Sequence, residues 1–573
     1  MKKSCTHCRQ EFEITQDDLA FYEKVSPVFA GKRYGIPPPK LCFDCRQQRR
    51  LSWRNEKRLY HRKCDLTGKQ ILSIYSQDKP YTVYEHHQWN TDVWDPLTYG
   101  REFDFSKPFF EQFDALHRAC PLRSFNLQLE SENSDYTNLA NSNCNCYLIF
   151  AASNNEDCYY STYIQRNKNV VDCFFVFDSE LCYECIDCYG CYNLQYSQFC
   201  QNCSDSLLLF DCKGCSNCFA CAALVNKQYH ILNQPYSKEE YEKIVQEVRG
   251  SRMRLEEVRR DFEALKLIVP HKEYAGISND NVSGDHLSFS KNTHHSFDCT
   301  YLEDCKYCTW FHRSKNCFDC YAWGFDCELG YDNHLCGINF HQVCFSESCW
   351  TNISNLLYCR YCLDGCKDCF GCVSLRHKQY CILNKQYTKE EYEELVPKII
   401  EHMKKTPLRS PSGSYEGQAG EWGEFFPTAI SCYAYNETVA QEYFPLTKEE
   451  VEKRGWKWKE EDEEQRQYLG PLIEVPDRIQ DVPDDISQKI LTCEVTKRPF
   501  KVLPQELRFY RTMGIPLPRR CFDQRHKDRM ALRNPRTLWD RVCVQCGKAI
   551  QTTYSPERLE TVYCEECYLS AVH

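Results

Sequence analysis

Eight cysteines, four near each end of the chain, have the spacing of metal-binding knuckles. Each group is made of two Cys-x2-Cys pairs separated by a loop, which is long in the first group and shorter in the second. The first group is Cys5, Cys8, Cys42 and Cys45, and the second is Cys543, Cys546, Cys564 and Cys567. Two such pairs supply four thiolates in a tetrahedron around zinc. The spacing therefore predicts two structural sites, or about two zinc ions per chain, over the alternative of unrelated thiols.

A run of arginines follows the first cysteine group, and a shorter run lies near the other end. Between residues 46 and 63 the chain has eight basic residues and one acidic residue. Arginines at steps of three and four lie on one face of a helix, and such a face beside a zinc knuckle suits phosphate. The alternatives are a solvated helix face or pairing with the acidic stretch 449–485. The nucleic-acid candidates are Arg46, Arg49, Arg50, Arg54, Arg58, Arg62, Arg525, Arg529 and Arg533.

Most of the 42 cysteines lie elsewhere, on a lattice of three residues. In DCFFVFDSELCYECIDCYGCYNLQYSQFCQNC (172–203), each cysteine lies a multiple of three residues from the next. Asp–Cys or Asn–Cys dipeptides recur every fifteen residues, and the positions at steps of three between them are small or apolar. Because cysteine is small and buries readily, we interpret these thiols as core. The pattern predicts a solenoid of fifteen-residue coils, stacked about 4.8 Å apart as strands are.

A longer repeat indicates that the chain has two such solenoids. The segment 217–245 recurs as the segment 368–396. Each copy ends in a capping-box sequence, at 237–240 and 388–391, which predicts the start of a helix. We expect each helix to close the open end of its solenoid, where unpaired strand edges would otherwise invite association.

The two ends of the chain are related to each other, since residues 35–64 align without a gap to residues 514–543. Each end therefore encodes two consecutive ribbons, of which only one keeps four cysteines. The ligand positions of the incomplete ribbons are Cys64, Thr67, Glu85 and Gln88 in the N-terminal half, and Cys493, Thr496, Cys521 and Gln524 in the C-terminal half. Because the halves keep opposite zinc sites, we expect the two terminal modules to contact each other, within one chain or in a homodimer.

These patterns divide the chain into consecutive modules. We expect an N-terminal zinc-ribbon module with a basic helix (1–125), a first solenoid (126–236), a helical cap and linker (237–275), a second solenoid (276–387), a capping helix (388–406), an acidic linker (407–489) and a C-terminal zinc-ribbon module (490–573).

Other chemistry has less support in the sequence. The run from Cys182 to Cys191 approaches a ferredoxin spacing, but its last gap is one residue short and no proline follows. A polythiol store for soft metals or redox chemistry stays open as an alternative. The pairs His86–His87 and His294–His295 have no partner pattern, so we interpret them as surface or core histidines. No nucleophile elbow, P-loop or dinucleotide fingerprint is present, so we name no catalytic residue.

The N-terminal residues MKKSCTHCRQEFEITQDD have no apolar run of the kind that a secretion signal needs, and no stretch approaches eighteen apolar residues. We therefore expect a cytoplasmic protein with no membrane contact, in which thiols stay reduced or bind metal.

Four phrases carry a resemblance to a known family: SELCYEC, NCFAC…KQYHILN, YNETVAQEYFPLTKEE and TTYSPERLETVYCEECY. The chain resembles a family of uncharacterised cysteine-rich zinc-ribbon proteins from ultra-small bacteria of candidate phyla. The resemblance implies a bacterial cytosolic setting and carries no activity with it.

Together these patterns predict a mixed, mainly β fold, with two cysteine-cored β-solenoid-like repeat domains, capping helices and zinc-ribbon modules at both ends. We expect a non-enzymatic zinc-binding scaffold for a macromolecule, with RNA or a ribonucleoprotein as the first candidate and a protein as another. One alternative is a soft-metal or redox polythiol protein, and the other is an enzyme whose site the sequence does not display.

Overall fold

The computed structural model describes residues 1–126, 128–407, 420–460 and 470–572, so parts of the expected acidic linker, 408–419 and 461–469, lie outside the described residues. The chain forms two compact units, each built from two separate segments. Unit 1 comprises Met1–Asn126 and Ala275–Lys459, and unit 2 comprises Leu127–Tyr274 and Glu460–His573. The fold is mixed and sheet-rich, and its larger sheets are almost entirely parallel.

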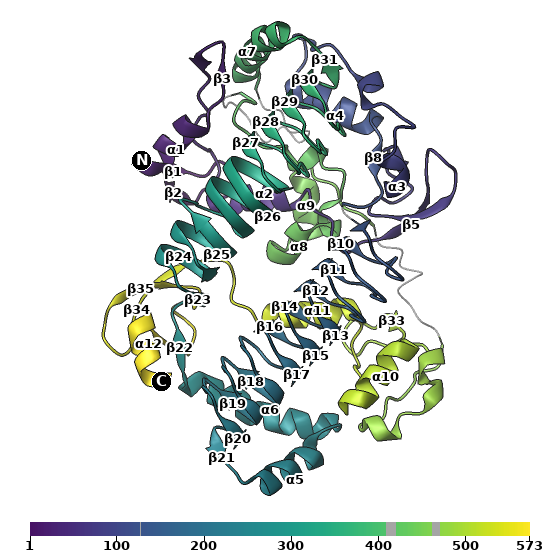
Figure 1. Ribbon diagram of the computed structural model, residues 1–573, viewed down its shortest axis with the longest axis vertical. Coiled ribbons are helices and arrows are strands. Elements are labelled where there is room, and N and C mark those ends of the chain that lie inside the picture. The colour runs from purple at the N-terminus through teal and green to yellow at the C-terminus, as the bar shows by residue number, and fades with distance from the viewer. Residues whose placement is uncertain (127, 408–419, 461–469, 573) are drawn as a thin grey trace. The chain divides into compact units, whose positions relative to one another are not determined.

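Unit 2 contains the first parallel stack, a series of short strands that follow one another along the chain (Figure 1). One sheet has β9 (Gln128–Leu129), β10 (Asn138–Asn141), β11 (Phe150–Ser153), β12 (Thr162–Gln165), β14 (Phe174–Phe177) and β16 (Ile186–Tyr189). The other has β13 (Lys168–Val171), β15 (Glu180–Tyr183), β17 (Tyr192–Gln195), β18 (Ser204–Phe210), β19 (Ser216–Ala222), β20 (Gln228–Ile231) and β21 (Gln234–Pro235).

The strands of the first stack pair at an offset of twelve residues, so the expected fifteen-residue coil is wrong. Ile164 lies opposite Val176, and Val176 lies opposite Cys188. From Leu139 to Leu232 every third residue has a positive φ, between 47° and 63°, so the chain bends at each third residue. Twelve and fifteen are both multiples of three. A spacing of fifteen residues is one twelve-residue register step plus three residues. Each Asx–Cys dipeptide therefore lies on the same three-residue lattice, but one bend further along than the dipeptide before it.

The bends explain why Asp or Asn so often precedes a lattice cysteine. Left-handed backbone costs most residues about 1–2 kcal/mol, whereas Asn and Asp visit it more readily because their side chains hydrogen-bond locally. Asp157, Asp172 and Asp187 all occupy such positions. The cysteine that follows each of them, such as Cys158, is fully buried, which confirms the predicted three-residue lattice of inward thiols.

Inside the first stack, the small polar side chains are hydrogen-bonded to the backbone. The thiol of Cys188 donates to the carbonyl of Ile186, two residues earlier, at 3.3 Å. The hydroxyl of Ser161 donates to the corresponding carbonyl, that of Tyr159, at 2.9 Å. Cysteine and serine thus make the same hydrogen bond, because both are small donors that satisfy a buried carbonyl beside a bend.

Unit 1 contains the second parallel stack, in which the offset varies. Asp280 lies opposite Lys291, Phe297 opposite Thr309, and Glu328 opposite His341, offsets of eleven, twelve and thirteen residues. Its strands are β23 (Gly276–Ile277), β24 (Asp280–Ser288), β25 (Lys291–Glu303), β26 (Thr309–Gly337), β27 (His341–Cys344), β28 (Ser354–Leu357), β29 (Lys367–Phe370), β30 (Gln379–Ile382) and β31 (Lys385–Gln386).

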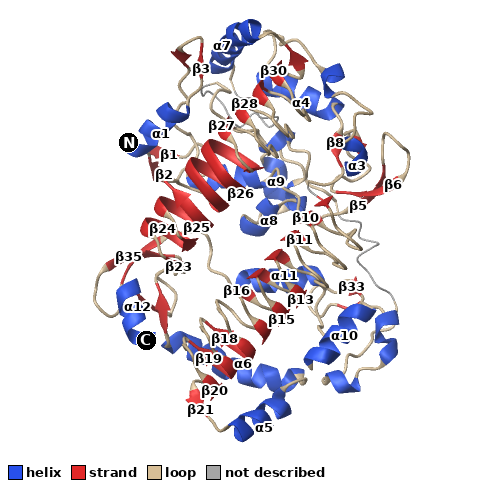
Figure 2. Ribbon diagram, in the orientation of Figure 1, coloured by secondary structure: helices blue, strands red, loops and turns tan. Residues whose placement is uncertain are grey.

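A helix follows each stack, as the capping boxes predict (Figure 2). The helices are α5 (Lys238–Val248) and α7 (Lys389–Lys405), and both have complete capping boxes at Ser237 and Thr388. Their buried tyrosines make matching contacts, because Tyr241 packs on Tyr229 at 5.7 Å and Tyr392 packs on Tyr380 at 5.8 Å between ring centroids. Each helix therefore lies against the last long strand of its own stack, β20 or β30.

The terminal modules complete the units. The N-terminal module has β1 (Lys2–Ser4), β2 (Glu11–Glu13), α1 (Gln16–Val25), β3 (Val28–Phe29), β4 (Lys32–Arg33), α2 (Phe43–Leu51), β5 (Tyr60–Lys63), β6 (Gln70–Ser73), β7 (Val83–Tyr84), α3 (His86–Trp89), α4 (Phe109–Ala119) and β8 (Leu122–Arg123). The C-terminal module has β32 (Leu491–Thr492), β33 (Pro499–Phe500), α10 (Pro504–Met513), α11 (Phe522–Ala531), β34 (Trp539–Val542), β35 (Ala549–Thr552), β36 (Thr561–Tyr563) and α12 (Glu565–Val572).

Three further elements connect these parts. In unit 2, α6 (Arg252–Ile268) lies against β19, and β22 (Pro270–Lys272) pairs with β36 of the C-terminal module. In unit 1, residues 420–459 form a strap that contains α8 (Val439–Tyr443) and α9 (Lys448–Lys453). Unit 1 thus pairs the N-terminal module with the second stack, and unit 2 pairs the first stack with the C-terminal module.

Candidate metal centres

Four ribbons share one backbone pattern, whether or not they keep four cysteines. Each begins at a cysteine whose N–H donates to the carbonyl five residues later, at 2.8–2.9 Å, and whose carbonyl accepts from the residue four positions on. The four starting cysteines are Cys5, Cys64, Cys493 and Cys543. The fourth residue after each has a positive φ, and these residues are Arg9, Gly68, Lys497 and Gly547. The backbone supports the expectation of two consecutive ribbons at each end.

The two complete ribbons bring four sulfur atoms together. All sulfurs of Cys5, Cys8, Cys42 and Cys45 lie within 4.8 Å of one another, and so do those of Cys543, Cys546, Cys564 and Cys567. The Sγ atoms of Cys8 and Cys42 are 3.6 Å apart, and those of Cys546 and Cys564 are 3.8 Å apart. Four sulfurs about 2.3 Å from one central ion lie about 3.8 Å apart. Both groups therefore have the geometry of a tetrathiolate metal site.

Electrostatics favour a thiolate at one position in each group. The hydrogen bond from the Cys45 thiol, aided by its backbone N–H, lowers the pKa of Cys42 to about 5. At Cys543, desolvation opposes ionisation, but N–H groups of Cys564, Cys546 and Gln545 lower the pKa to about 6. Metal ligands must be deprotonated, so N–H groups that stabilise a thiolate prepare it for a cation.

The incomplete ribbons keep the knuckle and lose ligands. At Cys64 the N–H of Glu85 donates to Sγ at 3.3 Å. At Cys493 the N–H of Thr496 donates to Sγ at 3.5 Å, and its hydroxyl lies 3.6 Å from Sγ of Cys521. Burial opposes ionisation of Cys493, but hydrogen bonds to its sulfur from the side chain and N–H of Thr496 and from the N–H groups of Cys521 and Val495 lower its pKa to about 7. Backbone donors thus still surround a sulfur where the tetrathiolate set is gone.

In unit 1 the arginines of α2 are buried against the second stack. Arg46 donates from Nε to Asp319 at 3.0 Å, and Arg50 donates to the same carboxylate at 3.1 Å. Arg50 also donates to Asp332 at 2.6 Å, and Arg49 donates to that second carboxylate at 2.8 Å. Asp319 and Asp332 both lie at bends with positive φ. The helix thus places its guanidinium groups along a column of carboxylates, which we name the arginine clamp of unit 1.

Unit 2 has the matching clamp. Arg525 on α11 donates to Asp172 at 2.5 Å, and Arg529 contacts the other oxygen of Asp172 at 3.1 Å. Arg533 makes two bonds to Asp187, at 2.8 and 3.0 Å. The bonds join the C-terminal module to the first stack. Sequence reasoning missed these carboxylates, although the Asp–Cys dipeptides mark both Asp172 and Asp319.

Most of the arginine face that the sequence indicated for phosphate is therefore engaged by carboxylates of its own unit. Ion pairs with carboxylates of their own unit are formed by Arg46, Arg49, Arg50, Arg54, Arg62, Arg525, Arg529 and Arg533. Arg54 bonds to Glu56 at 2.5 Å and Arg62 to Asp65 at 2.9 Å, while the backbone of Arg58 closes a turn with Asn55. The main partners of the two clamps lie on the stacks and outside the acidic stretch 449–485.

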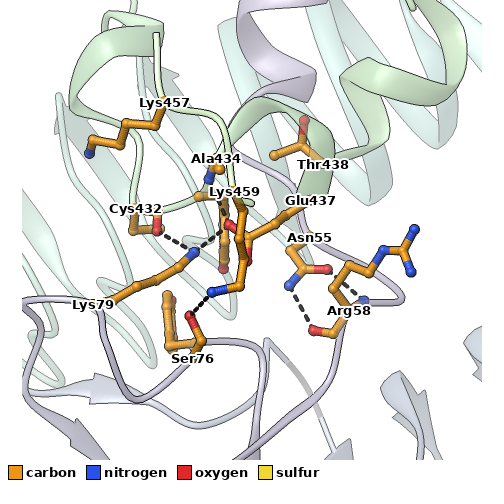
Figure 3. Close-up of polar contacts among 12 residues, drawn as sticks. Asn55, Arg58, Ser76, Lys79, Cys432, Ala434, Glu437, Thr438, Lys457 and Lys459 are labelled. Carbon is orange, nitrogen blue, oxygen red and sulfur yellow. Dashed lines mark hydrogen bonds and ion pairs between the residues drawn. The ribbon is translucent and has the colours of Figure 1, made fainter. Parts of the chain in front are cut away.

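The strap, which follows the second stack in sequence, makes polar contacts with the N-terminal module (Figure 3). Lys79 donates to Glu437 at 2.5 Å and to the carbonyl of Cys432 at 3.0 Å. Lys459 donates to Ser76 at 3.0 Å, whereas the side chain of Lys457 points away from this group and bonds to a strap carbonyl. These contacts join two segments of unit 1 that are far apart in sequence.

The interior thiols differ from the terminal ones in their surroundings. Across the described ranges, the two terminal groups are the only all-cysteine sets of three or more whose ligand atoms lie within 4.8 Å of one another. In the stacks the thiols donate to carbonyls instead, as Cys185 does to Leu194 at 3.3 Å and Cys308 to Cys317 at 3.2 Å. Geometry thus separates two candidate metal centres from a large set of core cysteines.

No helix in the part of the chain that the structure describes has the length and apolar character to cross a bilayer. No protein-family model matches the chain, and no curated protein matches it at a significant level. Fold and site together define a cysteine-rich, sheet-rich protein with two four-cysteine groups that can hold metal ions. The resemblance to zinc-ribbon proteins of candidate-phyla bacteria and the contact between residues 1–125 and 490–573 stay predictions.

Proposed function

We propose that this chain is a non-enzymatic, zinc-binding scaffold that presents a surface to a macromolecule. One observation carries the proposal: each terminal module combines a tetrathiolate group with a buried arginine clamp that joins it to a stack. Removing one partner of a buried ion pair costs about 3–5 kcal/mol. These ion pairs therefore hold each terminal module in one position on the stack of its own unit.

Zinc is the ion that these groups fit best. Four cysteines and no other ligand are typical of structural zinc, and the closed ligand set leaves no position for a substrate. One zinc per terminal module gives about two per chain. Since such metals contribute folding energy locally, each ion would stabilise the ribbon that binds it.

Each parallel stack is, in our proposal, a cysteine-cored solenoid. The support is the constant twelve-residue register of the first stack and the bend at every third residue. Four three-residue segments then make one coil, with one inward side chain on each segment. A narrow coil favours small interior side chains, and cysteine is the commonest residue of both interior clusters, although leucine, isoleucine and two phenylalanines also occur there.

RNA or a ribonucleoprotein stays the first candidate partner, with different residues from those that the sequence indicated. Phe289 and Tyr301 lie on the outside of the second stack, 46% and 55% exposed, with their rings stacked at 4.8 Å. Arg313 continues this column twelve residues on, half-exposed, with its guanidinium 4.9 Å from the Phe325 ring. Exposed aromatic rings beside arginine suit stacking with unpaired bases.

Binding to total RNA at low salt tests the partner. We expect binding that weakens steeply with added salt, and that the double variant Phe289→Ala/Tyr301→Ala reduces. Tyr192→Ala is the matched control, because Tyr192 is an exposed aromatic residue on the first stack. If the folded wild-type protein does not bind RNA, RNA is excluded as the partner. The zinc-binding part of the proposal would then be tested by metal analysis alone.

The alternative is a soft-metal or redox protein that uses the interior thiols. Its support is the large number of cysteines. Against it stand the hydrogen bonds that these thiols donate to carbonyls. Copper or iron well in excess of zinc in the purified protein would favour this alternative.

A further inference from the structure

We propose that Glu85, His86 and His87 form a third metal site, for a divalent transition-metal ion, in the incomplete ribbon of the N-terminal module. The site is independent of the two tetrathiolate groups. Glu85 stands at the ligand position that Cys564 occupies in the complete C-terminal ribbon, since the two ends align at a constant offset. A ribbon that keeps only Cys64 of its four cysteine positions would thus bind a metal through other residues beside the same knuckle.

The three side chains already converge. One ligand atom from each residue lies within 4.8 Å of the other two. Oε1 of Glu85 lies 2.9 Å from Nδ1 of His86, and the rings of His86 and His87 are 3.9 Å apart between centroids. Two ligand atoms that each lie about 2.0–2.1 Å from one ion are about 3 Å apart. The Glu85–His86 separation therefore matches two atoms that share a cation as well as it matches a direct ion pair.

The carboxylate of Glu85 is oriented by its other oxygen. Oε2 accepts the N–H groups of His87 and Gln88, both at 3.1 Å, as the N-cap of the short helix α3. This arrangement fixes the carboxyl plane and leaves Oε1 facing His86. A carboxylate held by such bonds needs little rearrangement to bind a metal.

His86 is the buried member of the group. Its residue is only 8% exposed, and its ring packs edge-on against Phe125 at 5.7 Å. Nδ1 is buried and makes no hydrogen bond among the described residues. Its neighbour is Oε1 of Glu85, 2.9 Å away, which pairs with a protonated imidazole and becomes a fellow ligand atom where a metal takes the place of that proton. A cation between the two atoms would satisfy both.

The ligand types select the class of metal. One carboxylate and two imidazoles suit zinc, nickel, cobalt or copper, whereas calcium and magnesium require more oxygen ligands. His87 is exposed, so the remaining coordination positions face solvent. We expect a site that is weaker than the tetrathiolate groups and open to a further ligand.

The test uses the full-length protein with its tetrathiolate sites filled with zinc. Cobalt is then titrated by calorimetry and followed by absorption. We expect one further equivalent of cobalt, whose spectrum lacks sulfur charge-transfer bands because no thiolate is a ligand. The variants Glu85→Gln and His87→Ala should each weaken this equivalent about tenfold or more. Glu85→Gln keeps an oxygen for the cap of α3, and His87 is exposed, so both variants should fold.

His341→Ala is the matched control, because His341 is an exposed histidine of the same unit on β27. It should leave the additional equivalent unchanged. The proposal would be overturned by the absence of a further equivalent in the wild-type protein, or by an equivalent that both site variants bind with wild-type affinity. Sulfur charge-transfer bands for the added cobalt would also overturn it, since they would place the ion on a cysteine.

Discussion

In both units, corresponding arginines join a terminal module to a stack, but the two units keep opposite four-cysteine groups. In unit 1 a pair of α2 arginines meets Asp319, and in unit 2 a pair of α11 arginines meets Asp172. The complete ribbon is the first of its module in unit 1 and the second in unit 2. The clamp is thus the common feature, while the ligands vary around a constant knuckle backbone.

The knuckle therefore does not depend on four thiolates. Cys64 and Cys543 have the same backbone hydrogen bonds, yet only Cys543 belongs to a four-sulfur group. The incomplete ribbon of unit 1 contacts the second stack through Tyr75 and Tyr361 and the strap through Lys79 and Glu437, contacts that do not require four thiolates. Variants at matching positions of the two units can separate the contributions of the thiolates, the stack interior and the clamps.

Removing one thiolate from a complete ribbon should have the largest effect. Cys5→Ser and Cys564→Ser should each cost one bound zinc and leave the other site filled. Structural zinc contributes about 10–16 kcal/mol of apparent binding free energy in zinc-finger peptides, so the affected ribbon should unfold locally. Metal content by mass spectrometry checks the result. Cys64→Ser, in the incomplete ribbon, is the control and should keep both ions. Equal zinc content in all three variants would show that the four-cysteine groups do not bind the zinc.

Placing a charge inside a stack should come next. Cys188→Arg in unit 2 and Cys336→Arg in unit 1 each bury an unpaired cation, since both cysteines are at most 1% exposed. The expected loss of stability is about 5 kcal/mol or more, confined to one unit. Hydrogen exchange resolves the two units separately. Cys188→Ser keeps the bond to a carbonyl and should be mild. A stable Cys188→Arg protein would contradict the inward placement.

Breaking one clamp should destabilise its own unit. Asp319→Asn and Asp172→Asn each leave two guanidinium groups without their shared counter-charge, at a cost of about 3–5 kcal/mol. Denaturant unfolding with hydrogen exchange should locate each loss in unit 1 or unit 2. Asp178→Asn is a suitable control, because Asp178 pairs with Arg166 at the surface. Losses no larger than that of the control would show that the clamps do not join module to stack.

Charge reversal at the arginines distinguishes the clamp from a phosphate-binding face. Arg50→Glu should lower the melting temperature of unit 1, because Arg50 is 1% exposed and donates to two aspartates. A phosphate-binding residue would instead lose RNA affinity at unchanged stability. Melting and RNA binding measured on the same variant decide between the two roles.

The smallest effect concerns pH at the incomplete ribbon of unit 2. The pKa of Cys493 is lowered to about 7, so its thiolate stabilises the folded state at high pH. That contribution falls as the pH drops from about 9 toward 7 and is absent below. The difference in melting temperature between wild type and Cys493→Ser should therefore grow as pH rises over this range. A difference independent of pH would contradict the hydrogen bonds at this sulfur.

The sequence predicted the three-residue lattice and both tetrathiolate groups, because each depends on local spacing. The coil length was wrong, since a dipeptide spaced by fifteen residues fits any lattice of three. The partners of Arg46 and Arg525 could not be predicted, because Asp319 and Asp172 lie in distant segments. His86 and His87 were interpreted as surface or core histidines. Their ligand atoms lie near that of Glu85 because of the local geometry of α3 and its N-cap, and no sequence periodicity predicts that geometry.

The metal content of the purified protein, measured together with its intact mass, distinguishes a zinc scaffold with a thiol core from a soft-metal or redox protein. We expect two zinc ions held by the terminal ribbons, no copper or iron, and a protein mass that shows every interior cysteine as a free thiol. Copper or iron in excess of zinc, or fewer than two tightly bound zinc ions in protein purified without chelator, would contradict the scaffold.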